Sequence, residues 1–170
     1  MSSHCPACAE VGVPPSGVKE SPILIIGSFP DDADLERGRP FMGTTGKVLR
    51  SELKIAGIEP FVVRMANLWL HKPNGNENCY KAGLDIALDE AKGREAILLV
   101  GSECVEVFTG HKVMDVCGLQ VDSPMLSCDT VFAVINPSSV FAPGAGVGEI
   151  RLALKKFADA CKKKGLLNEE

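Results

Sequence analysis

Four short, almost wholly apolar runs, separated by segments of helical periodicity, limit the fold more than any other feature of this chain. The runs span residues 23–26, 61–66, 97–100 and 131–135. Apolar runs of this length indicate strands that are covered on both faces, as in parallel sheets. Helices are predicted between and after them at 44–56, 78–92, 102–110 and 147–164. This alternation predicts an α/β fold, a three-layer α/β/α sandwich with a central, mainly parallel four-stranded sheet.

The length and composition set the class of protein. A chain of 170 residues predicts one domain over 1–170, in which 1–21 form a Cys-containing N-terminal segment and loop. No apolar run approaches the roughly 20 residues that cross a bilayer, and the N-terminus lacks the regions of a signal peptide. We therefore expect a cytoplasmic or nucleoid-associated protein whose seven cysteines are thiols or metal ligands. The net charge of −4 argues against broad, sequence-independent attraction to nucleic acid.

Three polar loops follow the predicted strands. The first loop begins at Gly27 and runs through Phe41. The second begins at Asn67, and the third begins at Asn136. Because the carboxyl ends of parallel strands share one edge of a sheet, we expect these loops to converge on one pocket. An aromatic ring such as Phe41 can stack there on a flat heterocycle, or it can belong to the core. The Asn67 amide offers both a donor and an acceptor to the edge of such a ring, or it can bond within a local turn.

The first loop carries a family resemblance. It reads Gly-Ser-Phe-Pro-Asp over 27–31, then a short acidic stretch, then Gly-Arg-Pro-Phe-Met-Gly over 38–43. This string resembles the uracil-DNA glycosylase superfamily, especially its iron–sulfur branch, family 4 and the related X type. Family 4 has Gly-Glu-Ala-Pro-Gly and Gly-Arg-Pro-Phe-Val-Gly at the same spacing. The resemblance spans roughly 5–157 and implies an enzyme of base excision repair that flips deoxyuridine out of DNA and hydrolyses its N-glycosidic bond.

The resemblance also implies roles for individual residues. Phe41 would stack on the flipped uracil, Asn67 would read its edge, and Asn136 would stabilise the departing uracilate. The other implied substrate-binding residues are Gly27, Phe29, Ser138 and Ser139. The two serines could bind the phosphates that flank the extruded nucleotide.

Two positions depart from the family pattern. The family Glu that orients the attacking water is Ser28 here, and a hydroxyl is no general base near neutral pH. Asp31 or Asp32 could replace it, or both could be solvated loop acids. The family His is Asn136, a neutral and weaker donor, although the mismatch-specific branch also has Asn-Pro-Ser. Ser28, Asp31 and Asn136 are therefore the catalytic candidates.

These departures leave two functions open. One is an active uracil-DNA glycosylase. The other is a catalytically weak or inactive glycosylase-like module that binds nucleic acid or takes part in replication. A nucleotide-binding regulator of the flavodoxin type is a third, which rests on the fold alone. The expected partner is DNA containing uracil, single- or double-stranded; we expect a monomer that does not bind membranes, with a replication or polymerase protein as a further partner to consider.

A pair of cysteines in C-x-x-C spacing, Cys5 and Cys8, indicates half of a metal or redox site. By the resemblance, the third ligand stands four residues after Asn67, where this chain has His71, as in the X type. Cys79 is the best fourth ligand. The leading interpretation is a [4Fe–4S] cluster with a structural role; zinc in a Cys₃His site fits the same residues, and free thiols in a loose tail are the remaining alternative.

Overall fold

Five strands form the central sheet, in the order β3-β5-β4-β6-β7. They are β3 (Ser16–Gly17), β4 (Ile23–Gly27), β5 (Arg64–Asn67), β6 (Ala96–Val100) and β7 (Val131–Val134). Strand β3 runs antiparallel to β5, and the other pairs are parallel. This computed structural model describes residues 3–168 and confirms the mainly parallel α/β fold. The predicted four strands are all present, but the second begins only at Arg64, because residues 61–63 form a turn in which Phe61 and Val62 are exposed. The sequence missed β3 because a two-residue strand has no apolar run to mark it.

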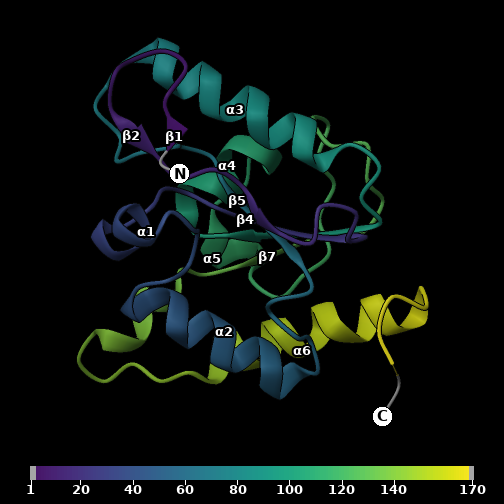
Figure 1. Cartoon of the computed structure of the whole chain (residues 1–170). Helices are drawn as coiled ribbons and strands as arrows, with labels where there is room; N and C mark the ends of the chain where they lie inside the picture. Colours follow the sequence, from purple (N-terminus) through teal and green to yellow (C-terminus); the bar gives the residue numbers. More distant parts are fainter. Residues whose placement is uncertain (1–2, 169–170) are drawn as a thin grey trace.

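Helices cover both faces of the sheet (Figure 1). Helices α2 (Thr44–Ala56) and α6 (Gly148–Lys163) lie on one face, and α3 (Glu77–Ala91) and α4 (Ser102–Thr109) on the other. The remaining short elements are β1 (Ser3–His4), β2 (Val11–Gly12), α1 (Asp32–Arg37), α5 (Val113–Val116) and the 3₁₀ helix η1 (Pro137–Phe141). Over the described part of the chain, no helix combines the length and apolar character that a membrane crossing requires.

The predicted helices lie within one or two residues of the observed ones. Helix α2 matches its predicted range, and Gly57 ends it in the left-handed conformation with φ 96°. Helix α3 begins one residue earlier than predicted, and the Asn76 carboxamide caps it by accepting from the backbone N–H groups of Asn78 and Cys79. The apolar face of α6 packs on the sheet, where Phe157 meets Phe132 edge to face at 5.7 Å between ring centres.

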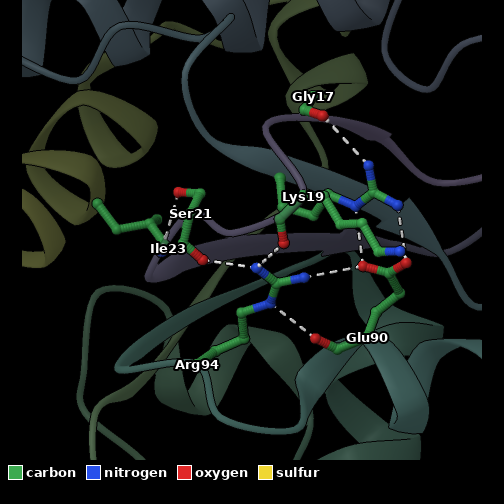
Figure 2. Close-up of polar contacts among 7 residues, drawn as sticks. Gly17, Lys19, Ser21, Ile23, Glu90 and Arg94 are labelled. Atoms are coloured by element: carbon green, nitrogen blue, oxygen red, sulfur yellow. Dashed lines mark hydrogen bonds and ion pairs between the residues drawn. The ribbon is translucent and has the colours of Figure 1, made fainter.

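A network of charged groups joins the edge of the sheet to the end of α3 (Figure 2). The Glu90 carboxylate accepts two hydrogen bonds of 2.8 Å from Arg64 and one of 3.0 Å from Arg94. Arg94 also donates to the carbonyl oxygens of Lys19 and Ser21, at 2.8 and 2.6 Å. Glu90 is only 15% exposed. The bonds from Arg64 lower its pKa below the ordinary value of 4.5.

Replacing Glu90 with glutamine is expected to reduce the free energy of unfolding by roughly 2–3 kcal/mol, because two arginines lose a charged acceptor. A carboxylate with a lowered pKa stabilises the fold above its unfolded pKa and loses that effect as the pH falls through the lower folded pKa. The gap between wild type and Glu90→Gln, measured by urea titration, should therefore be full at pH 7 and shrink below about pH 4.5. Asp89→Asn, at an exposed pair with Lys92, is the control. An equal loss in both variants would contradict a special role for Glu90.

Candidate functional site

A pocket of about 220 Å³ opens at the carboxyl edge of the sheet, where β4, β5 and β7 end. The structure brings all but one of the predicted catalytic and substrate-binding residues to its wall. These are Gly27, Ser28, Phe29, Asp31, Phe41, Asn67, Asn136 and Ser138. The exception is Ser139, which lines an adjoining groove. The three loops thus converge as parallel strand ends require.

Gly27 lies where the Phe41 ring and the Asn67 amide come together. A Cβ atom on Gly27 would lie 2.7 Å from Asn67 Oδ1 and 2.7 Å from Phe41 Cζ, closer than carbon atoms pack. Asn67 is 4% exposed, and its Nδ2 has no hydrogen-bond partner among residues 3–168. An unsatisfied buried donor costs about 1–3 kcal/mol. The wall of the pocket therefore carries an amide that a ligand with carbonyl groups would satisfy.

Phe41 adopts an uncommon backbone conformation. Its φ of 59° lies in the left-handed region, which a bulky side chain rarely occupies unless its surroundings hold it there. Arg50 donates to the carbonyl oxygens of Phe41 and Pro40, at 2.7 and 2.9 Å. A side chain on Gly46 would overlap the Phe41 backbone, so the glycine lets the loop lie directly on the first turn of α2. The ring is thus positioned before any ligand binds.

Asp34 holds the same loop from the other side, and sequence reasoning did not single it out. It is buried, and its Oδ1 accepts from the backbone N–H groups of Met42 (2.6 Å) and Gly43 (3.2 Å). Asp34 and Asp31 also form a reciprocal capping box at the start of α1. Burial raises the pKa of Asp34, although the hydrogen bond from the Met42 N–H acts in the opposite direction. An acid three residues after another acid was the available sequence signal.

A second cluster, close to the β1–β2 hairpin, contains the four predicted metal ligands. The ligand atoms of Cys5, Cys8, His71 and Cys79 all lie within 4.8 Å of one another. Cys8 Sγ is 3.4 Å from His71 Nε2. His71 Nδ1 lies 2.8 Å from the carbonyl oxygen of Lys72 and donates to it in the tautomer that leaves Nε2 free to bind a metal. Three sulfur atoms and one imidazole nitrogen form a donor set that suits zinc or an iron–sulfur cluster.

The cluster also affects the ionisation of its thiols. Burial opposes charge on Cys5, yet the backbone N–H of Ala7 and a hydrogen bond with His71 lower its pKa below the usual 9.0. Burial raises the pKa of Cys79 to about 11, and the neighbouring Cys8 and Cys5 add to that shift. Negative charge on one thiol thus disfavours ionisation of its neighbours, and a bound cation would remove this repulsion.

One chain segment links the cluster to the pocket. It begins with Asn67, and its end carries the ligand His71. Between them, the backbone N–H of Leu68 donates to the carbonyl of Gly27 at 2.8 Å, and that of Trp69 donates to the carbonyl of Ser28 at 2.9 Å. The segment that carries both Asn67 and His71 is thus held by backbone hydrogen bonds to the loop that begins at Gly27.

A family model matches most of this fold. Residues 14–157 match the model described as "Uracil DNA glycosylase superfamily". This match covers most of the chain, including the three loops around the pocket. The chain belongs to the uracil-DNA glycosylase superfamily. Membership implies that the protein binds DNA, and the four-residue cluster of three cysteines and one histidine is a potential metal site.

The two residues that depart from the uracil-DNA glycosylase pattern share one corner of the pocket. A Cβ atom on Gly101 would lie 3.1 Å from Ser28 Oγ and 3.5 Å from Asn136 Nδ2. Ser28 Oγ accepts a 3.3 Å bond from the backbone N–H of Cys104, in the first turn of α4. Asn136 Oδ1 accepts a 2.9 Å bond from the N–H of Ser138, which leaves Nδ2 as the free donor of this amide. This corner of the superfamily pocket offers a hydroxyl and an N–H donor.

The two acids considered as substitutes for the family glutamate differ in position. Asp31 lies on the pocket wall, where its Oδ1 accepts from the N–H of Asp34 at 2.9 Å. Asp32 has a side chain that is 89% exposed and pairs with Lys72 at 2.6 Å, so it does not line this glycosylase pocket. Besides Asp34, the sequence prediction missed Thr45, Gly46, Val100 and Pro137 on the wall. Thr45, Gly46 and Val100 come from the ends of elements predicted correctly, whereas Pro137 begins η1, which was not predicted. Only the packing of these elements brings the four residues to the pocket.

Proposed function

We propose that this chain is a uracil-DNA glycosylase that hydrolyses the N-glycosidic bond of deoxyuridine flipped out of DNA. One observation carries the proposal: the Phe41 ring and the unpartnered Asn67 amide meet over Gly27 in a pocket of about 220 Å³. Such a pocket suits a flat heterocycle that stacks on the ring and offers carbonyl and N–H groups at its edge. Uracil has both groups in that arrangement.

The chemistry follows from the remaining polar groups. The bond between C1′ and N1 breaks, and its electron pair passes to the uracil ring and its carbonyl oxygens. The Asn136 Nδ2 group donates to the oxygen that gains charge, as in an oxyanion hole. Water adds to C1′ of the sugar, and the Asp31 carboxylate on the pocket wall accepts its proton. The products are free uracil and an abasic site.

A gel assay tests this function. Labelled oligonucleotides with one deoxyuridine, single-stranded and paired, are incubated with excess protein and then cleaved with alkali at abasic sites. We expect product from deoxyuridine and none from thymidine or deoxycytidine. Ser28→Glu places a second carboxylate at the position of the family glutamate and should raise the rate above the rate that Asp31 alone supports. Ser51→Ala, exposed on α2, is the control. The absence of abasic product from any deoxyuridine substrate would contradict the proposal.

A second function, binding of uracil-containing DNA without cleavage, is favoured by one specific observation. The Ser28 hydroxyl is engaged with the start of α4 and supplies no general base. Fluorescence anisotropy on the same oligonucleotides separates the two functions. Preferential binding to deoxyuridine without any abasic product would identify a recognition module of the superfamily.

The Cys5, Cys8, His71 and Cys79 cluster is proposed to hold a structural metal. A single zinc ion with Zn–S distances of about 2.3 Å places tetrahedral ligand atoms about 3.8 Å apart. The observed ligand atoms all lie within 4.8 Å of one another. A [4Fe–4S] cluster binds its four ligands on four separate iron atoms and needs them farther apart. The spacing therefore favours zinc over the cluster that the resemblance implies.

A further inference from the structure

A second and larger groove adjoins the proposed uracil pocket. Its volume is about 880 Å³, and its walls come from α4, from α5 and from the segment that leads into α6. Asn136 and Ser138 line both the pocket and the groove. A ligand that continues beyond the flipped nucleotide would therefore pass directly from one into the other.

Apolar side chains form part of the groove surface. Val113 and Ile135 are nearly buried and contribute one face each. Met114 also lines the groove, and 69% of it is exposed. A thioether packs favourably against aromatic rings. The groove thus presents a surface on which a flat ring can lie.

The charges in the groove disfavour phosphate. Glu106 and Glu149 lie on its walls, and Lys112 is the basic residue among the lining residues. Neither carboxylate forms an ion pair with any residue between 3 and 168. Free carboxylates repel the phosphate backbone but accept hydrogen bonds from exocyclic amino groups of bases. The groove therefore suits an uncharged ring that carries an amino group.

Two glycines line the groove at positions where neither the backbone conformation nor the packing requires glycine. Gly146 and Gly148 line it, have no positive φ, and would have no atom within 4 Å of an added Cβ. The chain's own packing would therefore accept side chains at both positions. Glycine at such positions lets a ligand come close to the backbone.

From these features we infer that the groove binds the nucleobase next to the flipped uracil and prefers a base with an amino group, that is cytosine, adenine or guanine, over thymine. This inference rests on the proposed function. A neighbouring base can enter the groove only when it is not stacked and paired in a duplex. The protein should therefore act on single-stranded DNA, with a preference set by one neighbour of the uracil.

The test uses single-stranded oligonucleotides with one deoxyuridine. Each neighbour in turn is an abasic spacer, thymine or cytosine, and excision kinetics and anisotropy are measured for each. Stacking of one base is worth about 1–3 kcal/mol, so a spacer on one side should raise KM about 5- to 150-fold, and a spacer on the other side should have little effect. Thymine on the sensitive side should bind several-fold more weakly than cytosine.

A groove variant makes the result specific. Gly146→Leu should raise KM on the cytosine substrate and have no further effect on the spacer substrate, because the spacer already lacks the base that the groove binds. Leu119→Ala, exposed and outside the groove, is the control, and thermal melting checks the fold. Equal effects of both spacers, or an equal effect of Gly146→Leu on every substrate, would overturn the inference. If no oligonucleotide is cleaved, the proposed function fails, and anisotropy on the same set still decides the role of the groove.

Discussion

Gly27→Ala is expected to abolish uracil recognition while the protein still folds. The added methyl group would lie 2.7 Å from both Asn67 Oδ1 and Phe41 Cζ, so the amide or the ring must move. The backbone of Gly27 has no positive φ and accepts alanine, which limits the damage to the pocket. We expect kcat/KM for deoxyuridine excision to fall at least about 100-fold, which corresponds to about 2.7 kcal/mol of transition-state stabilisation.

The measurement is single-turnover excision together with thermal melting. Phe41→Ala provides the matched comparison, because it removes the ring that the new methyl group would displace. In the Phe41→Ala background, Gly27→Ala should cost less than it does in the wild type, because the clash with the ring is gone and only the clash with Asn67 remains. Ser51→Ala should leave both activity and melting unchanged. Full activity of Gly27→Ala would mean that the base does not bind between the Phe41 ring and the Asn67 amide.

Cys79→Ser is expected to remove the metal and to cause a large loss of stability. The four ligands come from the N-terminal hairpin, from the segment after β5 and from the start of α3, so a metal bound to all four would tie these three parts of the chain together. Structural zinc contributes about 10–16 kcal/mol in isolated zinc-finger peptides, and in a domain with its own core only a fraction of this, several kcal/mol, should be lost. Cys128→Ser, outside the cluster, is the control.

Metal analysis of the purified protein and its visible absorption decide the identity of the metal. Zinc without colour is expected from the spacing of the ligand atoms, whereas brown protein with bound iron would establish the cluster instead. Hydrogen exchange should report the link to the pocket, because the amides of Leu68 and Trp69 donate to the loop that begins at Gly27. Faster exchange of both amides in Cys79→Ser would connect the metal to Asn67. Unchanged metal content would remove Cys79 from the ligand set.

The convergence of the loops could be predicted because it depends on the direction of the strands alone. Buried apolar runs that alternate with helices specify a parallel sheet, and a parallel sheet places Gly27, Asn67 and Asn136 at one edge. The same reasoning gives no orientation of side chains. The left-handed conformation of Phe41 depends on Arg50 and on the contact with Gly46, and no local pattern encodes either.

The metal site also has a property that residue types alone do not determine, namely the number of metal atoms it binds. The C-x-x-C spacing identified Cys5 and Cys8, the resemblance to the iron–sulfur branch pointed to His71, and Cys79 was the best remaining ligand; the structure brings all four together. The number of metal atoms depends on the separation of the ligand atoms, which is set by how the hairpin packs against the segment from Asn67 to His71. The short strands β1, β2 and β3 escaped prediction for a related reason: each gains its stability from a partner strand rather than from its own residues.

The conformation of Phe41 has a consequence for protein engineering. A phenylalanine with φ 59° occupies a site that glycine or asparagine would fill with less strain. In a library selected only for thermal stability, Phe41 should therefore be replaced early. The surviving variants would be more stable proteins that lack the stacking ring. Under the proposed function, a thermostabilised version of this chain needs a screen for uracil binding at every round, because stability and recognition favour different residues at position 41.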